Sequence, residues 1–232
     1  MRSTNPKSQE EIGSRWRLIE GVEKETKVKG YIPSTLKKEM ALSLLEAACE
    51  KNPGLWKDHS IVAAQVAFRI AQAIPGADPE LCEIAGLLHD IGRIQGIFGV
   101  RHTVDGFDYL MELGYPNLAR YCITHAFPGK RLIEHTRWDF TIGQLAFVRT
   151  YLDRIEYDLT DKIIQIADFM ATAYGPMVME VRLMETALRN SINDKVFDFW
   201  QECYRVKAEI NHAVGGSVYD LFDPLLVDWP KK

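Results

Sequence analysis

Six residues of this sequence have side chains that can bind a metal ion, and each lies in a segment with an otherwise helical pattern. They are His59, the adjacent His89 and Asp90, His102, His125 and Asp168. Divalent ions bind imidazole nitrogens and carboxylate oxygens readily. His89 and Asp90 directly follow the apolar run 84–88, and polar groups at the end of a buried helix are costly unless they are paired or bound. The pattern therefore indicates a metal-dependent enzyme.

The six residues divide into two groups. Those that suffice for one ion, with positions left for water and substrate, are His59, His89, Asp90 and Asp168. His102 and His125 are expected to hold a second ion, with Asp90 as the bridge. The alternative for these two histidines is contact with a substrate phosphate or support of the other ligands. The expected cofactor is thus a pair of divalent ions, and these ligand types do not distinguish Fe, Mn, Co, Ni, Zn and Mg.

Helical patterns cover most of the chain and would position these ligands. The expected helices span residues 35–47, 57–73, 80–91, 104–113, 116–127, 142–156, 161–174, 177–190 and 194–213. Residues suited to cap or open helices are Ser34, Pro79, Thr103 and either Thr160 or Asp161. No alternating strand pattern is found. The sequence predicts one all-α helical bundle.

The domain organisation follows from the same pattern. Residues 31–232 are expected to form the helical domain, with the metal-site core at about residues 55–175. Residues 1–30 are rich in charge and are expected to form a helical or flexible extension. Residues 129–140 are polar and irregular, as in a loop. His135 and Asp139 in that loop could gate the site, and a surface role is the simpler interpretation.

Composition narrows the classes of function. The chain has 232 residues, of which 47% are hydrophobic, enough for one well-packed core. A net charge of -4 offers no basic field for dedicated nucleic-acid binding. No apolar run approaches the roughly 20 residues that span a bilayer, so no membrane partner is expected. The polar N-terminus and the dispersed cysteines favour a cytoplasmic protein with free thiols. The cysteines are Cys49, Cys82, Cys122 and Cys203.

The order of the six residues resembles the signature of the HD-domain phosphohydrolase superfamily. Residues 87–93, Leu-Leu-His-Asp-Ile-Gly-Arg, are close to the family form His-Asp-x-Gly-Lys, with Arg93 where lysine is usual. His102 begins a segment similar to the His-Pro-x-x-Gly motif of the two-metal branch, and His125 falls where that branch has its next histidine. Residues 161–169 resemble the final segment, in which a buried aspartate completes the site.

This resemblance covers about residues 55–175. It implies an all-helical HD domain, one or two divalent ions, and hydrolysis of a phosphate ester or anhydride by a metal-activated water. The substrate would be a nucleotide or another small phosphate compound. The catalytic residues implied are His89 and Asp90 at the metals and Arg93 at the phosphate.

Several cations could contact a substrate phosphate. They are Arg93, Lys130, Arg131 and Lys162. Arg93 lies one turn after the His-Asp pair, and its alternative partners are Asp105 and Asp108. For the other three cations, exposure to solvent is the competing interpretation.

Two features argue against the branch that hydrolyses cyclic dinucleotides. That branch, HD-GYP, has its Gly-Tyr-Pro motif downstream of paired histidines. Here residues 114–116 have that sequence but precede His125, and Ala126 follows where a second histidine would stand. The tripeptide is therefore interpreted as a helix stop and restart.

Two other functions fit the same scaffold. A di-iron oxygenase acting on a polyol or a phosphonate is permitted by four histidines and two aspartates. A non-catalytic module that binds metal or nucleotide is the third hypothesis. Oxygen consumption without phosphate release would favour the oxygenase, and binding without turnover would favour the module.

Overall fold

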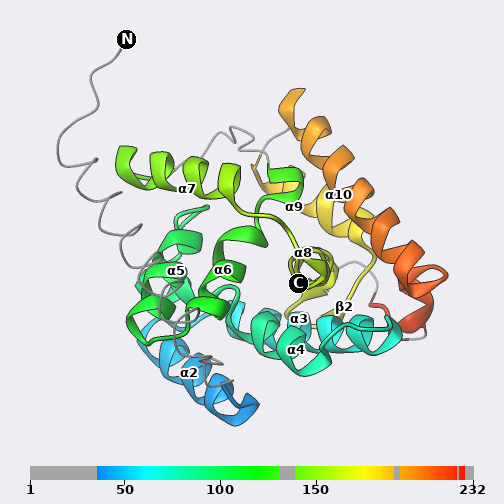
Figure 1. The fold of residues 1–232 in the computed structure, drawn as a ribbon, viewed down its shortest axis with the longest axis horizontal. Helices are drawn as coiled ribbons and strands as arrows, with labels where there is room; N and C mark the ends of the chain where they lie inside the picture. Colours follow the sequence, from blue (N-terminus) through cyan, green and yellow to red (C-terminus); the bar gives the residue numbers. More distant parts are fainter. Residues whose placement is uncertain (1–35, 131–138, 191–193, 224, 228–232) are drawn as a thin grey trace, which may run out of the picture.

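The computed structural model describes residues 36–130, 139–190, 194–223 and 225–227. Within these ranges the protein is a helical domain with one short hairpin, whose two strands have two residues each (Figure 1). The helices are α2 (Lys38–Lys51), α3 (Trp56–Ala73), α4 (Pro79–Leu88), α5 (His102–Glu112), α6 (Pro116–Thr124), α7 (Ile142–Arg154), α8 (Leu159–Met170), α9 (Met179–Asn190) and α10 (Asp194–Val214). Short 3₁₀ turns are η1 (Ile91–Gln95), η2 (Pro128–Lys130) and η3 (Val218–Leu221). The predicted all-α class is confirmed.

Helices α3, α4 and α8 form the centre of the fold. Figure 1 shows α8 nearly end-on, with α3 and α4 below it and α10 along the right side. Helix α3 packs against both α4 and α8, and Ile70, Leu87 and Ile163 are almost fully buried in the shared core. Burial of each such side chain contributes about 1.5–3 kcal/mol. This packing brings the start of α3, the end of α4 and the last turn of α8 together.

Gly86 allows the close contact of α3 and α4. A Cβ atom at this position would lie 2.6 Å from the Cα of Ala64 on α3. Since real Cβ atoms do not approach a backbone so closely, the two helices can cross here only with glycine at residue 86. The polar pair that follows α4 is thereby held near α3.

The helix ends agree in part with the predictions. Pro79 opens α4 as predicted, with Asp78 as its cap. Gly114 has a φ of 82° after α5, and Pro116 opens α6, as expected for a helix stop and restart. Ser34 lies outside the described residues.

Two of the predicted caps are wrong. The cap of α8 is Asp158, whose carboxylate accepts a hydrogen bond from the backbone N–H of Asp161 at 2.9 Å. Thr160 and Asp161 therefore lie inside the helix. Thr103 does not cap α5 either, since its hydroxyl donates to the carbonyl of Val100 at 2.8 Å.

The predicted end of α8 at residue 174 is also wrong. The helix stops at Met170, and strands β1 (Ala171–Thr172) and β2 (Gly175–Pro176) form an antiparallel pair. Strands of two residues are too short to show the alternating apolar and polar pattern by which strands are predicted from a sequence. Among the described helices, none is long and apolar enough to cross a membrane.

Candidate metal centre

The structure brings all six predicted ligands into one cluster, in which Asp168 is partly exposed and the other five are buried. His59 lies in the first turn of α3, and His89 and Asp90 follow the last turn of α4. The remaining three are the first residue of α5, the residue after α6, and a residue in the last turn of α8. These are His102, His125 and Asp168, respectively. Five segments far apart in the sequence thus contribute side chains to one centre.

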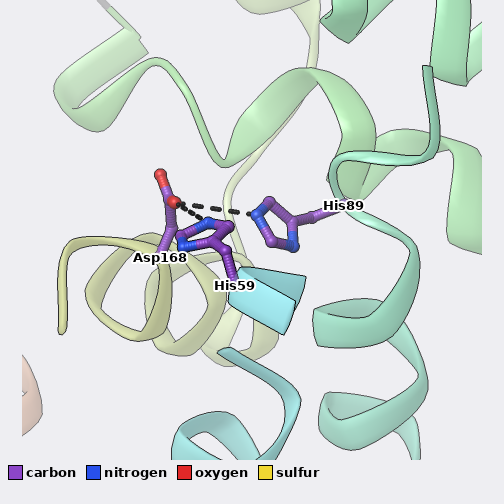
Figure 2. Close-up of side chains that lie close together, drawn as sticks. All are labelled: His59, His89 and Asp168. Atoms are coloured by element: carbon purple, nitrogen blue, oxygen red, sulfur yellow. Dashed lines mark hydrogen bonds and ion pairs between the residues drawn. The ribbon is translucent and has the colours of Figure 1, made fainter. Parts of the chain in front are cut away.

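The first group of possible ligands consists of His59, His89 and Asp168. The Nε2 atom of His59 lies 2.9 Å from Oδ1 of Asp168, and Nε2 of His89 lies 3.6 Å from the same oxygen. Figure 2 shows both rings directed at this carboxylate. These three donor atoms lie close enough together to share one ion.

The second group lies around the other carboxylate. Oδ1 of Asp90 is 3.0 Å from Nε2 of His102 and 3.8 Å from Nε2 of His125. Those two nitrogens are 3.4 Å apart. Oδ2 of Asp90 lies 2.6 Å from Nε of Arg93 and 4.0 Å from Nε2 of His89, which lies close enough to Asp90 and His125 to share an ion with them as well. The two oxygens of Asp90 thus have imidazoles of both groups as neighbours, which makes this carboxylate the candidate bridging ligand.

Backbone carbonyls set the orientation of three imidazoles. Nδ1 of His89 donates to the carbonyl of Gly86 at 2.7 Å, and Nδ1 of His125 donates to that of Tyr121 at 2.9 Å. Nδ1 of His102 donates to the carbonyl of Gly99 at 2.6 Å. These contacts assign the proton of each neutral ring to Nδ1 and leave a lone pair on Nε2. Metal-binding histidines in proteins are held in this way.

These lone pairs face other electron-rich atoms. Nε2 of His89 is buried without a hydrogen-bond partner. In its neutral form, Nε2 of His102 cannot donate a hydrogen bond to Oδ1 of Asp90, although the two atoms are 3.0 Å apart. A lone pair and a carboxylate repel each other at this distance unless a positive charge lies between them. The donor set therefore fits a divalent cation.

The electrostatics keep the ligands in the forms that metals bind. Burial, assisted by His89, lowers the pKa of His125 to about 3, so this ring is neutral. Burial opposes the charge of Asp90, but nearby positive charge, that of Arg93 first, outweighs it and holds the pKa of that carboxyl well below its usual value. Burial likewise opposes the charge of Asp168, and the hydrogen bond from His59 outweighs it and keeps that pKa low. Both carboxylates are therefore anionic at neutral pH.

The pKa of His89 is shifted in the opposite direction from that of His125. Burial disfavours its protonation, yet the charges of Asp90 and Asp168 outweigh burial and raise the pKa of His89 above its ordinary value. Two nearby carboxylates thus favour a positive charge at Nε2 of this ring. A metal ion would supply that charge in place of the proton.

Arg93 contacts Asp90. Its Nε donates to Oδ2 of Asp90 at 2.6 Å, and its Nη1 donates to the carbonyl of Phe98 at 3.3 Å. Asp105, one alternative partner considered from the sequence, pairs with Arg101 instead. The structure thus places the Arg93 guanidinium directly beside the ligand cluster.

The other proposed phosphate-binding cations are paired elsewhere. Lys130 Nζ lies 3.1 Å from a carboxylate oxygen of Glu156, and Lys162 Nζ lies 2.7 Å from one of Glu209 on α10. Arg131 and His135 lie outside the described residues. The structure therefore gives neither lysine a contact with the six ligands.

A buried polar network beside His125 was not anticipated from the sequence. Asp161 is fully buried and accepts a hydrogen bond from the hydroxyl of Thr124 at 2.7 Å and an ion pair from Arg120. The Gln165 amide donates to the carbonyl of Thr124 at 2.8 Å. This network ties the end of α6 to α8. The sequence marks Asp161 only as a polar residue near a helix start, and its partners Arg120 and Thr124 lie about 40 residues away.

Comparisons with known proteins agree with this geometry. Residues 56–173, just over half of the chain and including all six predicted ligands, match the HD domain. An uncharacterized protein of Methanocaldococcus jannaschii is 38% identical over 81 residues, which cover 33% of this chain and 46% of that protein. The match thus spans less than half of that relative. No solved structure matches the chain significantly. The chain belongs to the HD-domain family, whose members are mostly metal-dependent hydrolases.

Proposed function

We propose that this protein is a divalent-metal-dependent phosphohydrolase that acts on a nucleotide or another small phosphate ester or anhydride. One observation carries the proposal: Nε2 lone pairs of buried histidines converge on two anionic carboxylates. Such an arrangement is stabilised by cations and serves no evident need of the fold. Buried ligand clusters of this kind are typical of catalytic sites.

Two ions are proposed, one for each group of ligands. The first would be held by His59, His89 and Asp168, and the second by His102 and His125, with Asp90 shared. Bound ions of this kind lower the pKa of a coordinated water toward neutrality and offset negative charge on phosphoryl oxygens. The proximity of Asp90 to His89 as well as to His102 and His125 supports the shared role.

The protein's own residues prepare the site. The carbonyls of Gly86 and Tyr121 hold their histidine rings with Nε2 directed inward. Arg93 keeps Asp90 ionised and in one orientation. We propose that the Arg93 guanidinium, whose side chain is 21% exposed, also meets the charge of the substrate phosphate.

One observation favours a second candidate. Arg93, Lys130 and Lys162 each lie in an ion pair with a carboxylate of the protein, so their charge is partly offset before any phosphate binds. A di-iron oxygenase acting on a polyol or a phosphonate would need fewer phosphate contacts, and the four-histidine, two-aspartate set is compatible with iron. Oxygen consumption by the iron-loaded protein without phosphate release would favour this candidate.

The first experiment is elemental analysis of protein purified without oxygen or chelators, followed by a phosphate-release assay with a nucleotide panel. We expect about two ions per chain and turnover that stops when metal is removed. The Asp90→Ala variant should lose both metal and turnover. Asp153→Ala, at an exposed aspartate of α7, is the control and should retain both. Turnover by Asp90→Ala equal to that of the wild type would contradict the proposal.

A further inference from the structure

Asp139 holds the turn that precedes α5. Its Oδ2 accepts a hydrogen bond from the backbone N–H of Gly99 at 2.5 Å, and its Oδ1 accepts one from that of Arg101 at 2.9 Å. The aspartate and the turn are about 40 residues apart in the sequence. One carboxylate thus binds two backbone donors of a distant segment.

This contact lies directly before a helix that has no side-chain cap. Helix α5 begins at His102, and its N-cap residue Arg101 makes no side-chain capping bond. Backbone N–H groups around a helix start need acceptors, which a capping side chain usually supplies from within the same segment. Asp139 instead accepts the N–H groups of Gly99 and Arg101, just ahead of the helix, while those of Thr103 and Val104 bond to the carbonyls of Val100 and Arg101. The negative charge of Asp139 also suits the positive end of the helix dipole.

The same turn carries the partner of a proposed metal ligand. The carbonyl of Gly99 accepts the Nδ1 proton of His102 at 2.6 Å, and Nε2 of that ring lies 3.0 Å from Oδ1 of Asp90. A continuous series of contacts therefore runs from Asp139 through Gly99 and His102 to Asp90. The next carbonyl toward the N-terminus, that of Phe98, accepts Nη1 of Arg93.

His102 differs in this respect from the other two histidines that donate to carbonyls. His89 donates to Gly86 of α4 and His125 donates to Tyr121 of α6, so each is held by the helix that it follows. Gly99 belongs to no helix or strand. The position of the Gly99 carbonyl therefore depends on the contacts that hold the turn, and Asp139 makes two of them, to the N–H groups of Gly99 and Arg101.

We propose that Asp139 is a positioning residue for His102 and so determines the affinity of the second metal ion. The inference rests on the proposed function, because it assumes that His102 and His125 hold an ion. It predicts that loss of Asp139 weakens the ion at His102 and His125 and leaves the ion at the first group unaffected. The first group, His59, His89 and Asp168, has no contact with the turn in the described structure.

The test compares metal binding by the full-length Asp139→Ala and Asp139→Asn variants with the wild type. Apoprotein is titrated with Mn²⁺, and bound metal is counted by equilibrium dialysis and elemental analysis. We expect Asp139→Ala to keep one ion at wild-type affinity and to bind the second 10–100-fold more weakly, the usual effect of removing a supporting contact. The affinity of Asp139→Asn for the second ion should lie between those of the wild type and Asp139→Ala, because the amide oxygen still accepts one N–H.

Asp78→Ala is the matched control. Asp78 caps α4 by accepting the N–H of Leu81 at 3.0 Å, and it contacts no ligand histidine. This variant should unfold at a lower temperature and still bind both ions at wild-type affinity. Two ions bound at wild-type affinity by Asp139→Ala would overturn the inference, as would equal weakening of both ions or the same weakening in Asp78→Ala. Wild-type protein that binds no Mn²⁺ would instead contradict the proposed metal centre.

Discussion

Arg93 and Asp90 form an ion pair within the ligand cluster, with Nε of Arg93 2.6 Å from Oδ2 of Asp90. The guanidinium holds the pKa of the Asp90 carboxyl well below its usual value, against the opposing effect of burial. The protein thereby keeps a buried carboxylate charged even without metal. The same contact places a cation beside the six predicted metal ligands.

The first prediction concerns this pair. In chelated protein, Arg93→Gln leaves the Asp90 charge without its main partner. Breaking a buried pair costs about 3–5 kcal/mol, and the partial exposure of Arg93 favours the lower end, about 3 kcal/mol. Urea unfolding at pH 7 would measure this loss. The ionised Asp90 stabilises the fold because its pKa is lower in the folded state than in the unfolded state, where it is about 3.9. This contribution declines as pH falls below about 3.9, so the difference in unfolding free energy between Arg93→Gln and the wild type should shrink there.

Arg205→Gln is the control for the loss of an arginine. Arg205 pairs with Glu202 and Glu209 at the surface of α10, and such pairs contribute about 0–1 kcal/mol. A cost no larger in Arg93→Gln than in this variant would show that Arg93 does not stabilise Asp90.

The second prediction separates the two metal positions. Asp168→Ala should lose the ion of the first group and keep the second, while His125→Ala should do the reverse. Each variant would then hold about one ion per chain by elemental analysis, against two in the wild type. The physical reason is that Asp168 lies with His59 in the first group and His125 lies with Asp90 in the second, whereas His89 and Asp90 lie near both positions. Loss of all metal from both variants would point to a single shared ion.

The third prediction concerns acid stability of the apoprotein. Burial lowers the pKa of His125 to about 3, whereas the unfolded chain has the ordinary value of about 6.5. As pH falls through this window the unfolded state takes up a proton and the folded state does not. His125 therefore removes up to about 1.4 kcal/mol of stability per pH unit.

In the variant His125→Gln this contribution disappears, so the free energy of unfolding should fall less steeply between about pH 6.5 and 4.5. Urea unfolding at several pH values in the presence of a chelator measures the slope. His212→Gln, at an exposed histidine of α10, controls for the loss of a histidine elsewhere. An unchanged slope in His125→Gln would mean that the ring takes up its proton in the folded state.

The fourth prediction concerns the contact between α3 and α4. In Gly86→Ala the new Cβ would lie 2.6 Å from the Cα of Ala64, so the helices must separate. Overpacking of this kind costs about 1–3 kcal/mol. Separation should also weaken the first metal position, because His59 belongs to α3 and His89 follows α4.

Thermal unfolding and Mn²⁺ titration of Gly86→Ala measure both effects. Gly216→Ala is the matched control, since a Cβ there meets open space. Wild-type stability and metal affinity in Gly86→Ala would show that the helices can move apart without cost.

The sequence by itself determined the helical class and the identity of the residues in the cluster. Apolar periodicity, together with breakers such as Gly114 and Pro116, specifies helices locally, because each signal acts within one or two turns. The order of histidines and aspartates was readable for the same reason, since each stands out in its own apolar segment. The contact between Arg93 and Asp90 was also within reach, as the two residues are three positions apart.

Only the tertiary structure decided which atoms meet. Oδ1 of Asp90 meets both His102 and His125 because the end of α4, the start of α5 and the end of α6 come together in one particular way. Asp139 reaches the turn at Gly99, and Lys162 reaches Glu209, over separations of about 40 residues or more that no local pattern encodes. Side-chain direction depends on how helices pack, and packing depends on contacts such as that of Gly86 with Ala64, which appear only when the chain is folded.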